Sequence, residues 1–309
     1  MRKLAKTETA DVDASDSPFL LHNAATYQRW RDAKLDHYPV SAGDLVVEVA
    51  DPLSLTDAES VAMRDVCRKT NMVIYASRAT QADKEIPRAV GERFGLRRLD
   101  SNPLADEDGV SALQVTPEKS QRGYIPYSNR RLLWHTDGYY NSAERRIRAF
   151  VLHCAQPAAD GGENSLLDHE IAYILMRDAN PDYIRALMAP DAMTIPANTE
   201  LGAETRAAVT GPVFSVDPTD GNLHMRYTAR TRSIEWKPDA ATREAVQFLE
   251  NLLAGESPYL FRHIMTAGQG LLCNNVLHNR TAFRDDVDSG IARLVYRARY
   301  YDRIAGTDF

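Results

Sequence analysis

Two potential metal ligands stand two residues apart in the segment 134–141, which reads Trp-His-Thr-Asp-Gly-Tyr-Tyr-Asn. In an extended chain, side chains at positions i and i+2 point to the same face, so the His135 imidazole and the Asp137 carboxylate would converge on one point. One imidazole and one carboxylate leave a metal site incomplete. A fold that uses this pair must therefore bring a further ligand to it from elsewhere in the chain.

His278 is the strongest candidate for that third ligand among the eight histidines. It follows the apolar run 270–277, which would place it at the end of a strand, and it precedes a polar turn. Because His278 lies far from His135 in the sequence, only a closed barrel or a sandwich would join them. Two His and one carboxylate with open positions are typical of non-haem iron(II) oxygenases. A lone His-x-Asp pair is more often a surface or hydrogen-bonded core pair, and that interpretation stays open.

Short apolar runs bounded by turn residues predict strands, and a capping-box pattern at Thr56 and Glu59 predicts a helix. The predicted strands are 44–50, 71–76, 146–154, 212–216, 223–227, 263–266, 270–276 and 291–301, and the predicted helices are 56–69, 81–94, 168–178, one starting at 180–181, and 239–253. Residues 98–130 are predicted to be loops. The closely spaced strands of the second half favour one α+β domain with a β-barrel-like core and outer helices over a doubly wound α/β sheet.

Charge and cysteine content argue against several classes of protein. The net charge of −6 disfavours a general binder of nucleic acid or of anionic membranes, and no apolar run is long enough to span a bilayer. Residues 1–18 are polar and lack the apolar region of a secretory signal, so they are predicted to be a flexible tail before a single domain over 19–309. The three cysteines lack CxxC spacing and are expected to be free thiols of a cytoplasmic protein.

A run of arginines near the C-terminus is the second functional feature. On a strand over 291–301, Arg293, Arg297 and Arg299 would share one face. Such a face is either solvated or lines a pocket for anions. Arginine can hold a carboxylate through two parallel hydrogen bonds, which lysine cannot do. Ion pairs with the acidic loop 285–288 are the alternative use of these side chains.

Four segments occur in a specific order and spacing. They are Trp-His-Thr-Asp at 134–137, Asp-Gly-Gly-Glu-Asn-Ser at 160–165, Asn-Asn-Val-Leu-His-Asn-Arg-Thr at 274–281 and Arg-Leu-Val-Tyr-Arg at 293–297. Together they resemble the iron(II)/2-oxoglutarate-dependent dioxygenases of the taurine dioxygenase type (TauD/TfdA), within the clavaminate synthase-like superfamily. The second segment is similar to the Gly-Gly-Asp-Thr segment of that family. The resemblance covers roughly residues 70–303.

The resemblance implies a double-stranded β-helix (jelly roll) core with flanking helices. It implies that His135, Asp137 and His278 are catalytic residues that hold Fe(II). It also implies that Arg293 binds the distal carboxylate of 2-oxoglutarate, with Arg297 as its competitor for this role, and that O2 is the other co-substrate. The expected reaction hydroxylates a small metabolite and releases succinate and CO2. Halogenation is disfavoured because the related halogenases lack a carboxylate at the position of Asp137.

Further contacts are predicted on both sides of the metal segment. Asn164 or Ser165 stands where the family often has a Thr that helps to bind 2-oxoglutarate, although the Thr itself is not matched. The candidate substrate contacts are Arg131, Tyr139, Tyr140, Asn141, Arg230 and Arg297. Together they predict a small substrate that carries a carboxylate or another anionic group. The alternatives are that the tyrosines are packing residues and that the arginines form a solvated face.

Two other functions stay open on the sequence alone. One is a non-catalytic jelly-roll protein that binds metal or 2-oxoglutarate, and the other is a metalloenzyme of the same fold that does not use 2-oxoglutarate. The leading interpretation predicts a small-molecule substrate and no nucleic-acid or membrane partner. The sequence leaves open whether the protein is a homo-oligomer, which oxidation product forms, and whether residues 98–130 act as a lid.

Overall fold

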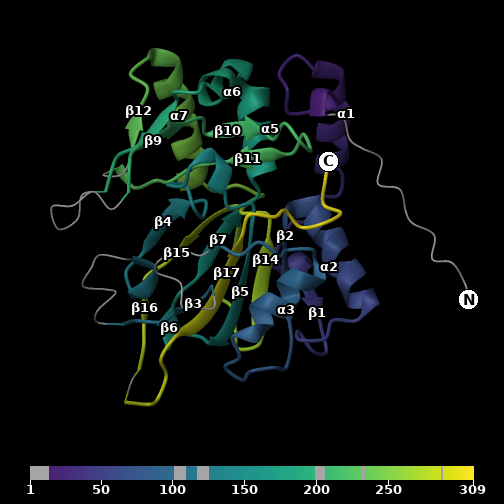
Figure 1. The fold of residues 1–309 in the computed structure, drawn as a ribbon, viewed down its shortest axis with the longest axis vertical. Coiled ribbons are helices and arrows are strands. Elements are labelled where there is room, and N and C mark those ends of the chain that lie inside the picture. Colours follow the sequence, from purple (N-terminus) through teal and green to yellow (C-terminus); the bar gives the residue numbers. More distant parts are fainter. Residues whose placement is uncertain (1–13, 101–108, 117–124, 199–205, 232–233, 287) are drawn as a thin grey trace, which may run out of the picture.

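The computed structural model describes residues 14–100, 109–116, 125–198, 206–231, 234–286 and 288–309. Its largest sheet has six strands in the order β1-β2-β14-β5-β17-β3 (Figure 1). In that order the strands are β1 (Val46–Glu48), β2 (Met72–Ala76), β14 (Gln269–Cys273), β5 (Ala149–Gln156), β17 (Leu294–Tyr300) and β3 (Val110–Leu113). The pairing of β1 with β2 is parallel, and the other pairings of this sheet are antiparallel.

A second sheet of four antiparallel strands carries both histidines of the predicted triad. Its order is β13 (Phe261–His263), β7 (Asn164–Leu167), β15 (Leu277–Arg280) and β4 (Leu132–His135). The smaller sheets pair β10 (Phe214–Val216) with β11 (Leu223–Met225), β8 (Met193–Ile195) with both β12 (Glu235–Trp236) and β9 (Val209–Gly211), and β16 (Phe283–Arg284) with β6 (Asp160–Gly161). Helices combined with mainly antiparallel sheets confirm the α+β class.

The six-stranded sheet separates two hydrophobic clusters. Alternate residues of β2 face opposite sides, so Ile74 belongs to one cluster and Tyr75 to the other. The cluster with Tyr75 packs under α2 (Asp57–Thr70) and α3 (Glu85–Arg93). The cluster with Ile74 includes Leu166 and Leu277 of the four-stranded sheet, together with residues of α5 (His169–Ala179), α6 (Pro181–Leu187) and α7 (Ala240–Ala254). The two sheets therefore face each other across one core.

Local capping signals fixed most of the predicted helices. Thr56 and Glu59 form the capping box of α2, and the side chains of Asp168, Asn180 and Asp239 accept hydrogen bonds at the starts of α5, α6 and α7. The predicted helix 81–94 is shorter and begins at Glu85. A further helix, α1 (Ala24–Leu35), was not predicted.

Two predicted segments need correction. Residues 110–113 were expected to be part of a loop region but form β3, because they pair along β17 over a long sequence separation. The strand expected at 263–266 ends at His263, since the chain turns before Gly268, whose φ of +86° suits glycine.

The lid suggested for 98–130 and the tail suggested for 1–18 lie in part outside the described residues. Within the tail, Ser17 is buried and its hydroxyl donates to the Gly221 carbonyl (2.7 Å).

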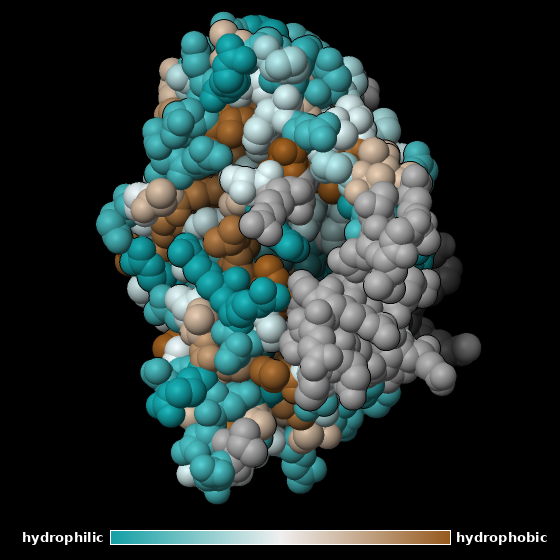
Figure 2. All heavy atoms as spheres, turned by 90° about the vertical axis from the view of Figure 1, so that its left-hand side faces the viewer, coloured by the Kyte–Doolittle hydropathy of each residue, from teal (hydrophilic) through white to brown (hydrophobic). Residues whose placement is uncertain are grey.

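The side of the molecule that bears β4, β9 and β12 shows hydrophilic residues interspersed with apolar patches (Figure 2). A groove of about 350 Å³ lies between α7 and the segment before β12, and Thr228, Trp236 and Gln247 are among its lining residues. Within the described part of the chain, no helix has the length and apolar character needed to cross a membrane.

Candidate metal centre and anion pocket

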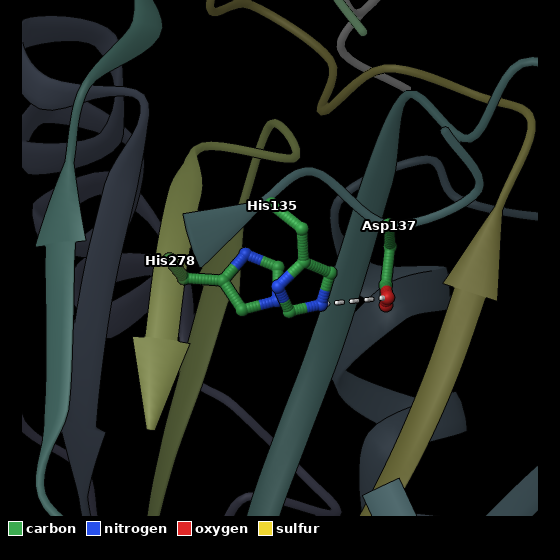
Figure 3. A group of neighbouring side chains, drawn as sticks. All are labelled: His135, Asp137 and His278. Carbon is green, nitrogen blue, oxygen red and sulfur yellow. Dashed lines mark ion pairs between the residues drawn. The ribbon is translucent and has the colours of Figure 1, made fainter. Parts of the chain in front are cut away.

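The structure brings the three predicted metal ligands together (Figure 3). His135 on β4 and His278 on β15 are direct partners in the antiparallel register, and their ring centres are 4.2 Å apart. Asp137 follows the end of β4, and its Oδ1 lies 3.8 Å from His135 Nε2. One ligand atom from each residue lies within 4.8 Å of the others, and all three side chains are buried. The arrangement is a compact set of two imidazoles and one carboxylate.

Backbone carbonyls fix the orientation of both imidazoles. His135 Nδ1 donates to the carbonyl of Leu133, and His278 Nδ1 donates to the carbonyl of Val276, each at 2.9 Å. A carbonyl can only accept, so the proton of each neutral ring lies on Nδ1 and the lone pair on Nε2 is left for a metal. Hydrogen bonds of this kind are typical of metal-binding histidines.

Asp137 is held in place by Asn275, a residue that the sequence did not single out. The Asp137 N–H donates to Asn275 Oδ1 (2.7 Å), and Asn275 Nδ2 donates to the carbonyls of Asp137 (2.9 Å) and Ile147 (2.6 Å). Gly138 has φ +69°, and an added Cβ would lie 2.5 Å from Ile147 Cγ1. The turn after β4 therefore depends on glycine and on the Asn275 side chain. Asn275 adopts a positive φ (+51°). No sequence pattern showed this conformation or the contacts of its side chain.

The segment after β11 completes the support of the metal strand. The N–H of Thr136 donates to the carbonyl of Tyr227 (3.0 Å), and the N–H of Tyr227 donates to Thr136 Oγ1 (3.1 Å). The N–H of Ala229 donates to the carbonyl of Trp134 (2.7 Å). These bonds fix the backbone on both sides of His135.

The electrostatics of the triad suit a divalent cation. Burial, with a smaller contribution from the charge of His278, lowers the pKa of His135 to about 3, and burial also lowers the pKa of His278. Burial alone would raise the pKa of Asp137, but the charges of Arg297 and Arg299 hold it below its usual range. At neutral pH the site thus presents two neutral imidazoles and one carboxylate, which is the donor set that iron(II) takes in non-haem oxygenases.

Arg297 and Arg299 lie on β17, and their charges act on Asp137 of the triad. Arg297 Nη1 lies 3.2 Å and 3.3 Å from the two carboxylate oxygens of Asp137. Arg299 pairs with the buried Asp100 and donates to the Tyr140 hydroxyl (3.1 Å). Among the described residues, neither side chain pairs with Asp285, Asp286 or Asp288, which was the alternative suggested by the sequence.

Arg293 lies in a separate small pocket. The pocket is lined by Gly161, Gly162, Asn164, Arg293 and Val295, among other residues. Arg293 is buried, and its Nη1 has no hydrogen-bond partner among the described residues. Ser165, the alternative to Asn164, is buried in β7 and its N–H donates to Asn279 Oδ1 (3.2 Å). Asn164 is therefore the member of this pair that shares the pocket with Arg293.

Arg280, which the sequence analysis also passed over, lies beside this pocket. It is the cross-strand partner of Asn164, and Nη2 of its buried guanidinium donates to the carbonyls of Ser128 (2.8 Å) and Arg130 (2.6 Å). Burial, with a smaller effect from the charge of Arg293, lowers the pKa of Arg280 to about 9.

The candidate substrate residues occupy different environments. The Tyr139 ring lies edge-on to His135 with centres 6.4 Å apart. Burial raises the pKa of its hydroxyl, and the nearby charge of Arg230 and the Thr228 side chain oppose this rise. Tyr140 contacts Arg299, as described above. Asn141 Nδ2 donates to the Arg145 carbonyl (2.8 Å) within its own turn. Arg131 is exposed just before β4. Tyr139 and Arg230 thus lie near each other beside the triad. Arg131 and Asn141 have no such contact with the triad among the described residues.

Comparison with known proteins finds relatives over most of the chain. Residues 34–299 match the family described as Taurine catabolism dioxygenase TauD, TfdA family. A uridine-5'-phosphate dioxygenase from Amycolatopsis sp is 32% identical over 219 residues, covering 67% of this chain and 72% of that protein. One from Streptomyces sp is 28% identical over 225 residues, covering 70% and 79%. The solved structure of the non-haem iron oxygenase OrfP with Fe and alpha-ketoglutaric acid superposes with a TM-score of 0.59 at 14% identity, covering 80% of each chain.

Proposed function

The chain belongs to the taurine catabolism dioxygenase TauD, TfdA family, and we propose that its substrate is uridine 5'-phosphate or a closely related nucleotide, which it oxidises. It is a dioxygenase that uses iron(II), 2-oxoglutarate and O2 and acts on a small molecule. The choice of substrate rests on the similarity to two uridine-5'-phosphate dioxygenases over most of the chain. A phosphate ester also meets the expectation of an anionic substrate.

Three buried residues would hold the iron. His135, Asp137 and His278 fit iron(II) because both Nε2 atoms are free, the carboxylate is ionised and their ligand atoms lie within 4.8 Å of one another. Three protein ligands leave coordination positions for the co-substrates, and the bound metal supplies the activation of O2 for substrate oxidation. The chain's own residues orient the ligands and keep bulk water from the buried site.

Arg293 would hold the distal carboxylate of 2-oxoglutarate. Its guanidinium is buried, its Nη1 has no hydrogen-bond partner in the described part of the chain, and Asn164 lies in the same pocket. Arg297 is the weaker candidate for this role because its Nη1 is already bonded to Asp137. We assign Ser165 a structural role in β7, since it does not line the pocket as Asn164 does.

The substrate would lie on the side of Tyr139 and Arg230. Arg230 carries a positive charge for the phosphate, and its contact with Tyr139 places it next to His135. The groove lined by Thr228 and Trp236 offers space for the nucleoside, and its volume falls within the ~300–1,000 Å³ of small-molecule sites. Thr228 connects the two places, because it lines the groove and forms a β-bridge with His135.

The architecture supports further parts of the proposal. The two facing sheets would be the halves of a double-stranded β-helix within a single domain over 19–309. Three buried free cysteines support a cytoplasmic location. The net charge of −6 supports the absence of nucleic-acid and membrane partners.

Succinate formation with a nucleotide panel tests the substrate directly. Iron-loaded protein is incubated with 2-oxoglutarate, O2 and either uridine 5'-phosphate, uridine, cytidine 5'-phosphate or taurine. We expect succinate in proportion to the uridine 5'-phosphate consumed, much less with uridine, and a several-fold rise in KM for the nucleotide in Arg230→Gln. Equal turnover of uridine and its phosphate would reject the phosphate-binding role, and turnover of taurine alone would reject the nucleotide.

A further inference from the structure

Arg280 and Arg293 place two buried guanidiniums around one phenyl ring. Arg280 Cζ lies 4.7 Å and Arg293 Cζ lies 5.1 Å from the ring centre of Phe283. Both arginines are almost fully buried, with exposures of 4% and 6%. Arg280 reaches this position from β15, two residues beyond His278, and Arg293 reaches it from the chain just before β17.

The described residues supply no carboxylate that pairs with either of these two guanidiniums. Within the described part of the chain, neither guanidinium forms an ion pair with a carboxylate, and Arg280 Nε and Arg293 Nη1 have no hydrogen-bond partner. The nearby Asp285 accepts a hydrogen bond from the Arg293 backbone N–H (2.9 Å) and not from its guanidinium. Two buried like charges without a counter-ion are unfavourable, and an anion placed near both would relieve this cost.

We propose that Arg280 is a second positively charged residue of the site for the distal carboxylate of 2-oxoglutarate, and that it raises the affinity for this co-substrate by its charge. The proposal rests on the proposed function, which assigns the direct contact to Arg293. The register of the four-stranded sheet supports it, because Arg280 is the partner of Asn164 and Asn164 lines the pocket with Arg293. Arg280 thereby acts as a positioning residue for the anion.

A purely structural role for Arg280 makes a different prediction. Its Nη2 donates to the carbonyls of Ser128 and Arg130, which precede β4, so its loss would loosen this segment from β15. A loosened sheet would weaken every 2-oxo acid alike. A charge effect acts only on the ligand that carries the distal carboxylate.

The test compares 2-oxoglutarate with 2-oxopentanoate, which has the same carbon chain but lacks the distal carboxylate. Both are titrated anaerobically into the Fe(II)-loaded full-length protein, and binding is followed by the visible charge-transfer absorption of the metal-bound 2-oxo acid. In Arg280→Gln we expect the Kd for 2-oxoglutarate to rise about ten-fold and that for 2-oxopentanoate to stay within about two-fold. Arg280→Lys keeps the charge but not the fork to the two carbonyls, and we expect its Kd for 2-oxoglutarate to stay within about three-fold of the parent value.

Arg284→Gln is the matched control, since Arg284 is an exposed arginine on the neighbouring strand β16 and its loss should change neither Kd. Equal weakening of both 2-oxo acids in Arg280→Gln would overturn the proposal, as would a Lys variant as weak as the Gln variant. If the parent protein itself bound 2-oxoglutarate no better than 2-oxopentanoate, the proposed function would fail before Arg280 came into question.

Discussion

The metal centre and the anion pocket differ in how their charges are balanced. At the metal centre, Asp137 is paired with Arg297, and the neighbouring Arg299 is paired with Asp100. In the anion pocket, neither Arg293 nor Arg280 pairs with a carboxylate among the described residues, and the neighbouring Asp285 accepts from the Arg293 backbone N–H instead. The charges of the first site are thus balanced by ion pairs within the protein. We propose that a bound anion balances the charges of the second.

Under the proposed function, this difference divides the work of the active site between two sets of residues. The triad and Asn275 would build a rigid site for the cation, while Arg293 and its neighbours would determine which 2-oxo acid is held. Although His278 and Arg280 share β15, the described hydrogen bonds of Arg280 and Arg293 involve no residue of the triad, so substitutions in the anion pocket should leave the affinity for iron nearly unchanged.

Asp137→Ala should have the largest effect on the metal side. It removes the single carboxylate of the triad and also leaves Arg297 without its partner, so we expect iron binding to weaken by more than about 100-fold. Iron retained after anaerobic loading and desalting measures this, with succinate release as a second readout. Asp160→Ala, an exposed acid on β6, is the control. Full iron retention in Asp137→Ala would show that the triad is not the metal site.

Arg293→Gln should have the largest effect on the anion side. Loss of a buried charge that binds a carboxylate is expected to raise the apparent KM for 2-oxoglutarate by about 100-fold. Iron retention should stay within about two-fold of the parent value, because Arg293 does not contact the triad. An unchanged KM, or a parallel loss of iron, would contradict the separation of the two sites.

Asn275→Ala should weaken the metal centre without removing a ligand. The variant loses both hydrogen bonds to the Asp137 backbone, so we expect about ten-fold weaker metal affinity. Titration with Mn(II), followed by the free ion, gives the affinity. Asn274→Ala is the control, because Asn274 is buried next to it but bonds to Asn71 and Thr307. Both variants should unfold more easily, yet the Asn274 variant should keep its metal affinity.

The pH dependence of metal affinity should be small. An ordinary imidazole with a pKa of about 6.5 becomes protonated between about pH 7.5 and about pH 5.5, and its neutral fraction falls roughly ten-fold. A site with two such ligands would therefore bind the metal roughly a hundred-fold more weakly at the lower pH. In the folded protein the pKa of His135 is about 3 and that of His278 is lowered, so protons compete little in this range. We expect a change of less than about three-fold in Mn(II) affinity, and a hundred-fold loss would contradict the assigned environment.

The metal-free protein should respond to acid in its stability instead. The unfolded chain binds protons at its histidines below about pH 6.5, whereas the folded imidazole of His135 stays neutral to about pH 3. Stability contributed by the buried neutral ring is therefore present above about pH 6.5 and is lost as the pH falls toward 3. Denaturant unfolding at several pH values measures this loss, and a metal-free protein whose stability rises in this range would oppose the assignment.

Local signals predicted much of the fold, and long-range contacts account for what was missed. The capping residues of α2, α5, α6 and α7 stand in the sequence beside the helices that they start. The unpredicted α1 buries Lys34, a residue that usually faces solvent. Its ammonium pairs with Asp168 (2.8 Å) and Glu170 (2.5 Å), and no pattern within 24–35 reveals these partners.

The candidate site shows the same division. His135 and His278 were matched by motif, and the antiparallel register places them directly opposite each other. Asp137, however, lies beyond the end of β4, so the turn at Gly138 and the Asn275 side chain bring it to the imidazoles, and strand alternation does not. The pairing of Arg299 with Asp100 likewise joins residues far apart in the sequence.

Anaerobic titration of the metal-free protein, first with Fe(II) and then with 2-oxoglutarate, tests whether the triad holds the iron and Arg293 holds the co-substrate. We expect a visible charge-transfer absorption that requires both additions, is lost in Asp137→Ala, and in Arg293→Gln appears only at far higher 2-oxoglutarate with normal iron binding. Iron binding without that absorption in the parent protein, or an Arg293→Gln variant that loses iron and 2-oxoglutarate together, would contradict this assignment.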